Sequence, residues 1–313
     1  MEHTVLRYEK EVKYMNNENK TNINWYPGHM AKTKKQIQED LKLVDVVVEI
    51  LDSRIPKSSQ NPDISKMMEG KKRIIVLNKS DLADENENKK WQSFFNNKGI
   101  PTIIANSNSG IGSKETIKKV REIMTEDMLK QEQKGRIQKN IRLMIVGIPN
   151  VGKSSFINRI AKKNSTIVGN KPGVTKQKQW IRIENNIELL DTPGVLWPKF
   201  ENQEVALNLA FTGTIKDEIM DEYEIAFYLI SFLYENYKIN LQERYSITDN
   251  ELVNVFCEDI DTSEKIVNLI ELIGKKRGAI ISGGKLDGTK TARLILEDFR
   301  SGKFGRISLE KVK

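Results

Sequence analysis

Cysteine and histidine are scarce in this chain of 313 residues, and long apolar runs are absent. The single cysteine, Cys257, excludes an internal disulfide and a cysteine-based metal cluster, and it fits a reducing compartment. No apolar run approaches the ~20 residues that a membrane-spanning helix needs. Residues 1–24 lack the apolar stretch of a secretory signal. The sequence therefore predicts a cytoplasmic protein that is not attached to a membrane.

Charge is unevenly distributed along the chain, whose formal net charge is +8. Residues 215–272 carry 14 acidic and 4 basic side chains, whereas residues 274–313 carry 11 basic and 4 acidic ones. The basic end is a candidate surface for a polyanion such as RNA, although a solvated lysine-rich tail has the same composition.

Strand patterns and helix patterns alternate in the first two thirds of the chain. Short β-branched runs are expected to be strands at 44–51, 73–77, 102–105 and 141–146. Helical patterns lie between them at 32–41, 86–97 and 113–134. Residues 180–183 and 187–190 flank Asn185 and Asn186 and are typical of a hairpin. This alternation predicts a mostly parallel sheet with helices on both faces.

After about Lys216 the strand signals stop. The remaining patterns are helical, at 221–237, 249–257, 262–272 and 288–301. The chain is therefore expected to consist of a flexible leader (1–24), an α/β domain (25–214) and a smaller α-helical domain (215–313). Met1 and Met15 both remain open as the start of the protein.

The segment GIPNVGKS, Gly147 to Ser154, matches the phosphate-binding pattern G-x-x-x-x-G-K-[ST] between a strand pattern and a helix pattern. Its two glycines let backbone N–H groups close around phosphate oxygens. Lys153 is expected to reach the β and γ phosphates, and Ser154 to supply a hydroxyl to Mg²⁺. The nucleotide-binding residues predicted from this segment are Asn150, Val151, Gly152, Lys153, Ser154 and Ser155.

The segment NKSD follows the apolar run RIIVL and is typical of a loop that binds guanine. The carboxylate of Asp81 accepts two N–H bonds from the guanine edge, whereas adenine offers no matching pair. Asn78 is expected to tie neighbouring loops together, and the Lys79 stem to lie over the base. The later segment ANSNSGIG is expected to present Ser107 and Asn108 to the base, although an alanine is more usual at Asn108.

Two segments after the phosphate loop complete the pattern of a phosphate-loop NTPase. Thr175 ends NKPGVT, and Asp191 and Gly194 stand in DTPG. Thr175 is expected to supply a second hydroxyl to Mg²⁺, Asp191 a magnesium-linked carboxylate, and Gly194 a backbone N–H to the γ-phosphate. A plain strand-ending turn is the alternative for DTPG. The apolar Val195 follows Gly194, so the group that acts on the attacking water must come from elsewhere.

The guanine-type loop precedes the phosphate loop, which reverses the usual order. A ligand depends only on where strand ends lie in space, so a circular permutation of the chain preserves the site. The predicted fold class is therefore α/β: a circularly permuted phosphate-loop GTPase domain at 25–214, followed by a smaller α-helical domain. Such a protein binds GTP and GDP, and hydrolyses GTP to GDP and phosphate.

These motifs together resemble the circularly permuted GTPases, and within them the bacterial ribosome biogenesis GTPases. The resemblance is carried by NWYPGHMAKT, LDSRIP, NKSDL, GIPNVGKSSFIN, GNKPGVTK, DTPGVLWPK and LDGTKTARLILEDFRSGKFGR. It covers nearly everything from Asn24 to Arg306, and the leader departs from it. The resemblance implies GTP hydrolysis stimulated by the large (50S) ribosomal subunit, a late role in assembly of that subunit, and rRNA contacts through the C-terminal helical domain.

Two residue roles rest on this resemblance. It implies that His29, in WYPGHMAK, swings towards the γ-phosphate on the ribosome, where neutral imidazole suits the orientation or deprotonation of water. A helix cap or an RNA contact is the alternative for His29. The resemblance also implies that Asn150 helps to hold K⁺ beside the phosphates. Tolerance of the loop's backbone geometry is the alternative for Asn150. The catalytic set is thus predicted to be His29, Lys153 and Gly194.

The last helical pattern places cations opposite its apolar residues. The candidate RNA-binding side chains are Lys290, Arg293, Arg300, Lys303 and Arg306. A solvated amphipathic helix is the alternative, and the protein is expected to be a monomer. Two other functions remain open: a GTPase that acts on another RNA or signalling target, and a GTP-gated RNA-binding module with little turnover.

Overall fold

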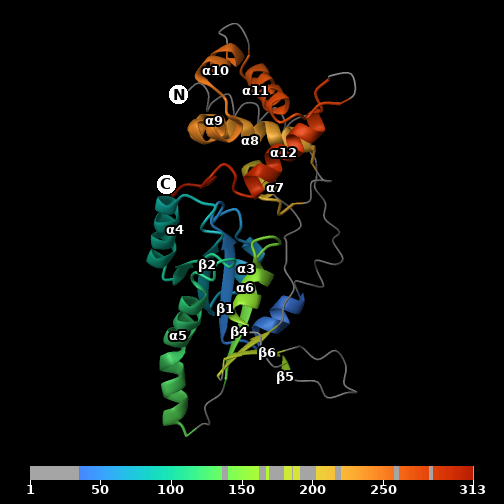
Figure 1. The fold of residues 1–313 in the computed structure, drawn as a ribbon. Helices are drawn as coiled ribbons and strands as arrows, with labels where there is room; N and C mark the ends of the chain where they lie inside the picture. The colour runs from blue at the N-terminus through green and yellow to red at the C-terminus, as the bar shows by residue number, and fades with distance from the viewer. Residues whose placement is uncertain are drawn as a thin grey trace, which may run out of the picture.

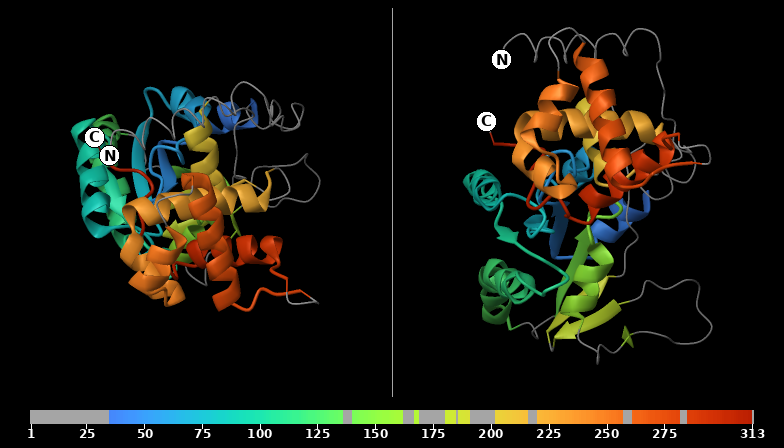
Figure 2. Two further views of the ribbon diagram at one scale, coloured as in Figure 1. Left: turned by 90° about the horizontal axis from the view of Figure 1, so that it is seen from above. Right: turned by 45° about the horizontal axis from the view of Figure 1, so that its top comes forward.

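The computed structural model of the chain describes residues 35–135, 140–161, 167–168, 180–184, 186–190, 202–215, 220–256, 261–281 and 285–312. Within these residues a seven-stranded sheet and a group of helices are stacked end to end (Figure 1). Two further views show helices α7–α12 lying across one end of the sheet (Figure 2). Among the described helices, none combines the length and the apolar character needed to span a bilayer.

The sheet has the strand order β3-β2-β1-β4-β7-β6-β5. Neighbouring strands from β3 to β7 pair in parallel, and β6 runs antiparallel to both of its neighbours. The bounds are β1 Val46–Asp52, β2 Lys72–Asn78, β3 Thr102–Ile104, β4 Ile141–Val146, β5 Ile167–Val168, β6 Trp180–Glu184 and β7 Ile187–Leu190. The predicted mostly parallel sheet is confirmed, and β6 and β7 form the expected hairpin.

Helices cover both faces of the sheet. They are residues 35–41, α3 (Pro62–Met67), α4 (Glu85–Asn97), α5 (Ser113–Gln133) and α6 (Lys153–Ile160). Val48 of β1 lies in one buried cluster with side chains of α5 and α6. Val47 packs in a second cluster with residues 35–41 and α3, and Leu51 in a third with α4. Because successive strand residues point to opposite faces, this alternation positions a helical layer on each side.

The helical part is organised around α8, which packs against α7, α9, α11 and α12. The bounds are α7 Gln203–Phe211, α8 Glu222–Asn236, α9 Lys238–Tyr245, α10 Asp249–Val255, α11 Thr262–Lys276 and α12 Gly288–Arg300. Leu229, Ile230 and Leu233 of α8 are fully buried in this core. The four predicted helices correspond to α8, α10, α11 and α12, whereas α3, α7 and α9 were not expected. Helix α11 also extends beyond residue 272, where its prediction ended.

The chain returns to the sheet after α12. Residues 302–312, called the C-terminal strap below, run from α12 to α4 (Figure 1). The Ile307 amide donates to the Leu82 carbonyl at 2.9 Å, and the Leu309 amide donates to the Arg54 carbonyl at 2.9 Å. Trp91 Nε1 of α4 donates to the Glu310 carbonyl at 3.3 Å. The strap therefore connects the helical part to the sheet by backbone hydrogen bonds.

Candidate functional site

A cavity of about 550 Å³ lies at the carboxyl ends of β2, β3 and β4. Its walls come from residues 78–82 without Ser80 at the end of β2, from 106–108 after β3, from 150–155 without Val151 after β4, and from Arg300 and Ser301 at the end of α12. The carboxyl ends of parallel strands meet at one edge of a sheet, and this edge is the usual position of a ligand site in such folds. The guanine-type loop and the phosphate loop are thus brought together in space despite their reversed order.

The cavity collects most of the residues predicted to bind nucleotide. These are Asn78, Lys79, Asp81, Ser107, Asn108, Asn150, Gly152, Lys153, Ser154 and Ser155. Val151 is buried beside them. The other predicted site residues, His29, Thr175, Asp191 and Gly194, lie outside the described residues. The cavity is also lined by Leu82, Asn106, Arg300 and Ser301, which were not predicted to bind nucleotide.

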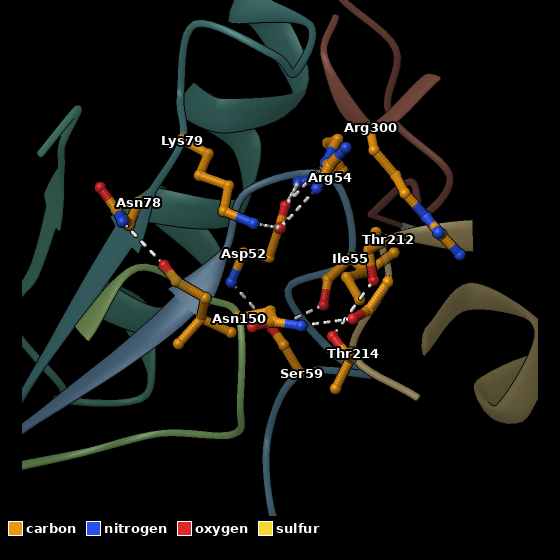
Figure 3. A network of polar contacts seen from close by, with 12 residues as sticks. Asp52, Arg54, Ile55, Ser59, Asn78, Lys79, Asn150, Thr212, Thr214 and Arg300 are labelled. Carbon is orange, nitrogen blue, oxygen red and sulfur yellow. Dashed lines mark hydrogen bonds and ion pairs between the residues drawn. The ribbon is translucent and has the colours of Figure 1, made fainter. Parts of the chain in front are cut away.

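Asn78 joins the loops that surround the cavity. Its Nδ2 donates to the Val151 carbonyl at 2.7 Å (Figure 3). Its Oδ1 accepts from the Ser107 amide at 3.0 Å and from the Ser107 hydroxyl at 2.7 Å. Asn78 is 2% exposed. Because a buried amide without partners is costly, these bonds hold the three loops in one arrangement.

The loop after β3 is also attached to the helix that follows the phosphate loop. Arg159 of α6 donates through Nε to the Ser107 carbonyl at 3.3 Å and through Nη2 to the Asn108 carbonyl. Asn106 shapes the same loop, because its Oδ1 accepts from the Asn108 amide at 2.9 Å. These contacts fix the backbone of Ser107 and Asn108 at the cavity wall.

A buried carboxylate directs the Lys79 side chain. Asp52, the last residue of β1, accepts from Arg54 Nε at 3.0 Å and from Arg54 Nη2 at 2.8 Å. The Lys79 ammonium lies 3.0 Å from Asp52 Oδ2 (Figure 3). Burial alone raises the pKa of Asp52, but the two cations outweigh burial and hold this pKa below its ordinary range. Asp52 therefore stays ionised, and its ion pair with the Lys79 ammonium fixes the orientation of the Lys79 side chain.

The role of Asp52 was not deduced from the sequence. LDSRIP contributed to the family resemblance but had no assigned chemistry. Its position was the available signal: an acid at the end of an apolar strand is rarely buried without a cation, so a nearby cation could have been expected. The strand register explains why that cation is Lys79, because Asp52 of β1 pairs with Asn78 of β2, the residue before Lys79.

The phosphate loop owes its shape to unusual backbone angles. Gly147 has a φ of 153°, Asn150 of 61° and Gly152 of 92°. A Cβ at Gly152 would overlap Asn78 Nδ2, so both the conformation and the neighbour require glycine. Helix α6 begins at the next residue. The N–H groups of its first turn have no partners within the helix and are donors suited to an anion.

Lys153 supplies the charge of the phosphate loop. Its ammonium donates to the Ile148 carbonyl within the loop. Burial lowers the pKa of Lys153 to about 8, because the charged form loses hydration. An anionic phosphate beside this ammonium would favour the charged form again. The loop therefore combines backbone donors with one cation whose charge depends on pH.

Arg300 contacts the last residues of α7, and Asn150 contacts Gly213 just after that helix. Asn150 Nδ2 donates to the Gly213 carbonyl. Arg300 donates through Nε to the Phe211 carbonyl at 3.2 Å and through Nη2 to the Ala210 carbonyl at 2.8 Å. Figure 3 shows Thr212 on the side of segment 210–213 that faces Arg300. Residues 210–213 therefore connect the phosphate loop to the end of α12.

The cations predicted to bind RNA have contacts within the chain. Arg293 pairs with Glu222 at 3.0 Å, Lys303 with Asp298 at 3.1 Å, and Arg306 with Glu85 of α4 at 3.3 Å. Lys290 is exposed, whereas Arg300 is half-buried against α7. Exposed ion pairs contribute only ~0–1 kcal/mol and can exchange one partner for a phosphate. RNA binding stays a prediction for all five cations, of which Arg300 is directed at the carbonyls of α7.

Comparison with known proteins assigns the chain to a family. The family described as 50S ribosome-binding GTPase matches residues 142–270. The chain is 46% identical over 289 residues to ribosome biogenesis GTPase A of Bacillus licheniformis, and the match covers 92% of this chain and 98% of that protein. The chain belongs to the ribosome biogenesis GTPase A family. It is also 32% identical over 302 residues to mouse mitochondrial ribosome-associated GTPase 1, a match that covers 92% of this chain and 90% of that protein.

The fold agrees with this assignment to the ribosome biogenesis GTPase A family. GNP-bound YlqF from Thermotoga maritima is similar in structure, with a TM-score of 0.61 and 28% identity, and the match covers 90% of this chain and 98% of that one. The chain is therefore a ribosome biogenesis GTPase. Its sheet part has the circularly permuted phosphate-loop GTPase fold, and a helical part follows it.

Proposed function

We propose that this GTPase drives a late step in assembly of the large (50S) ribosomal subunit. In this proposal residues 25–214 hydrolyse GTP, residues 215–313 contact rRNA, and the protein works as a cytoplasmic monomer. The main support is the cavity itself, because the loops that would bind GTP share it with the end of the basic helix α12. The names of the relatives, which refer to ribosomes, support the choice of target.

Guanine selection is assigned to the loop after β2. Asp81 is exposed at the cavity wall, where its carboxylate would accept two N–H bonds from the base. Lys79, held by Asp52, would lie over the base plane. Ser107 and Asn108 would offer backbone groups to the base from the loop that Arg159 fixes.

The donor set at the phosphate end suits hard cations. We assign Ser154, Thr175 and Asp191 to Mg²⁺, because hydroxyl and carboxylate oxygens are its preferred ligands. Of these, Ser154 lies among the described residues and lines the cavity. When bound, Mg²⁺ neutralises charge on the β and γ phosphates. We assign Asn150 to K⁺ through its carbonyl oxygen, since its amide nitrogen already donates to Gly213.

The potassium assignment predicts a dependence on the monovalent cation. Hydrolysis by the wild-type protein should be several-fold faster in potassium chloride than in sodium chloride at equal ionic strength, on the order of the charge stabilisation that a fixed cation supplies. Equal rates in the two salts would remove K⁺ from the proposal. They would leave the GTP assignment intact.

Catalysis is assigned to Lys153, to the Gly194 amide and to His29. Lys153 would stabilise charge on the transferred phosphoryl group, and His29 would orient water. His29→Ala should lower turnover in the presence of large subunits by about 100-fold, the usual scale of general acid–base catalysis. Its affinity for GDP should match wild type. Unchanged stimulated turnover would exclude His29 from catalysis.

The cellular role is tested by depleting the protein and sedimenting the ribosomes. The proposal predicts that immature large subunits accumulate while small subunits mature normally. A normal ribosome profile would instead favour a different RNA or signalling target. Rescue by the wild-type gene but not by the His29→Ala variant would connect the assembly defect to GTP hydrolysis.

A further inference from the structure

We propose that Arg54 is a positioning residue for the guanine base: it fixes the Asp52 carboxylate that orients Lys79, and it is itself held by α12 and the C-terminal strap. This inference rests on the assignment of the cavity to a guanine nucleotide, and it extends that assignment. Through Arg54 the helical part takes part in base binding without touching the base. A partner that displaced α12 would therefore change the affinity for nucleotide.

The first observation is the geometry of the ion pair between Arg54 and Asp52. The guanidinium binds both carboxylate oxygens, with Nε 3.0 Å from Oδ1 and Nη2 2.8 Å from Oδ2. The Arg54 amide also donates to Oδ1, at 3.1 Å. In Figure 3 dashed lines join the Asp52 carboxylate to Arg54 and to the Lys79 ammonium, which lies 3.0 Å from Oδ2. A bidentate pair fixes the plane of the carboxylate, so Arg54 determines how Oδ2 faces Lys79.

The second observation is that packing alone does not explain the arginine at this position. The Arg54 side chain is 2% exposed, as is that of Asp52. Among the described residues, Nη1 of Arg54 has no hydrogen-bond partner. A buried N–H group without a partner is costly, and an apolar side chain of similar length would avoid that cost. An apolar side chain could not, however, hold the Asp52 carboxylate.

The third observation is that Arg54 lies against the helical part and the strap. Its guanidinium carbon is 5.2 Å from the centre of the Phe299 ring of α12, within the range of a cation–π contact. The Phe299 side chain is buried. The Arg54 carbonyl accepts from the Leu309 amide at 2.9 Å and from the Glu310 amide at 3.3 Å. Both the side chain and the backbone of Arg54 are thus held by the last segments of the chain.

Lys79 is constrained from its backbone as well. It lines the cavity, and its φ of 59° is a left-handed conformation that residues other than glycine seldom adopt. With the backbone fixed, the direction of the side chain depends on its ion-pair partner. Contacts therefore run without interruption from Phe299 through Arg54 and Asp52 to the lysine stem expected over the base. Loss of one of these contacts should weaken base binding through Lys79.

The test is a double-mutant cycle between Arg54 and Lys79. GDP and guanosine each compete against a fluorescent GDP analogue, and apparent dissociation constants are measured. Arg54→Met should weaken both ligands by the same factor, about tenfold, because only the base contact is affected. Lys79→Met should also weaken both ligands equally. The double variant should bind them as Lys79→Met does, within about twofold, because Arg54 acts through Lys79.

A purely structural role of Arg54 gives different results. Losses that multiply in the double variant would mean that Arg54 does not act through Lys79. A loss for GDP without a loss for guanosine would move its effect to the phosphate side. Either result, or no loss in Arg54→Met, overturns the proposal. Arg73→Met is the matched control, because Arg73 pairs with buried Glu49 across the same two strands, at the end of β2 away from the cavity. It should bind both ligands as wild type does.

Phe299→Leu tests the contact with α12 and also serves if Arg54→Met does not fold. It removes the ring beside Arg54 but keeps an apolar side chain, so it should weaken GDP and guanosine equally, by about threefold, and have no such effect in a Lys79→Met background. Phe304→Leu is its control, because this buried ring of the strap packs against Tyr245 instead. Wild-type affinity in Phe299→Leu would overturn the link to α12. Failure of wild type to prefer guanine over adenine nucleotides would instead reject the cavity assignment.

Discussion

The base side and the phosphate side of the cavity are built differently. The base side depends on buried side chains, since Asn78 binds Ser107 and Asp52 binds Lys79. The phosphate side depends on backbone shape, with positive φ at Asn150 and at Gly152 and the start of α6 beyond. Side-chain changes on the base side should therefore alter which base is bound. Backbone changes on the phosphate side should decide whether any nucleotide is bound.

The largest expected loss of nucleotide affinity comes from substitution of Gly152, which lies where the phosphate side meets Asn78 of the base side. Gly152→Ala forces a Cβ onto Asn78 Nδ2 and an unfavourable φ of 92°. We expect the affinity for both GDP and ADP to fall by about 100-fold or more, because strain of a few kcal/mol has that scale. Isothermal titration of purified protein measures this loss.

The matched control is Gly278→Ala. Gly278 also has a positive φ, of 64°, but no heavy atom lies within 4 Å of the Cβ position. The Gly278→Ala variant should therefore be somewhat less stable than wild type, and its affinity for nucleotide should be unchanged. If Gly152→Ala bound GDP as tightly as Gly278→Ala did, backbone shape would not define the phosphate side.

A substitution on the base side should change which nucleotide base is preferred, while the contacts to the phosphates stay intact. Asp81→Asn should lower GTP affinity by about 100-fold through the loss of two charge-assisted hydrogen bonds. It should gain affinity for xanthosine triphosphate, whose base edge complements an amide. Asp84→Asn is the control, because Asp84 caps α4 and asparagine is also a good cap. Unaltered preference for GTP in Asp81→Asn would contradict the guanine assignment.

The pH dependence of binding should come from the phosphate side. Burial lowers the pKa of Lys153 to about 8, so its charged fraction falls as pH rises through that value. A phosphate favours the charged form. GDP affinity should therefore fall above about pH 8, by up to about tenfold per pH unit, with uptake of a proton on binding. Calorimetry in two buffers of different ionisation enthalpy measures the uptake, and Lys153→Ala should abolish it. A pH-independent affinity would show that Lys153 is fully charged in the free protein.

The smallest expected effect is on protein stability and concerns the C-terminal strap, which does not line the cavity. Burial raises the pKa of Glu310 despite hydrogen bonds from Ser58 and Lys57. An acid whose pKa is raised in the folded state loses its stabilising contribution as pH rises above its ordinary value of 4.5.

In wild type the free energy of unfolding should therefore fall as pH rises above 4.5, and in Glu310→Gln this fall should be smaller by roughly 1 kcal/mol. Chemical denaturation at a series of pH values measures this change. Glu297→Gln, at an exposed position of α12, is the control and should keep the wild-type profile. A Glu310→Gln profile parallel to wild type would show that the strap does not titrate.

The sequence was sufficient for features with local signals. Apolar runs predicted β1, β2 and β4, and the glycine-rich pattern before Lys153 predicted the phosphate loop at the start of α6. Helix α7 was missed because its residues from Ala206 to Phe211 are all buried and show no amphipathic period. Helix α9 was missed because it follows α8 with only Tyr237 between them.

Contacts between distant segments had no local signal. Lys303 and Arg306 stay exposed, as a basic surface requires, but no pattern predicted that the strap carrying them would bind the sheet, with Ile307 and Leu309 buried. The inward position of Arg300 depends on the end of α7, which no periodicity could place beside α12. Such pairings are set by tertiary packing, which sequence patterns alone do not encode.

The central claim is that segments of reversed order meet to form one guanine nucleotide site. The most direct test measures the dissociation constants of the purified wild-type protein for GDP and ADP under identical conditions. GDP should bind at least about 100-fold more tightly than ADP, because adenine would leave the carboxylate of Asp81 unpaired. Comparable dissociation constants for the two nucleotides would contradict the claim.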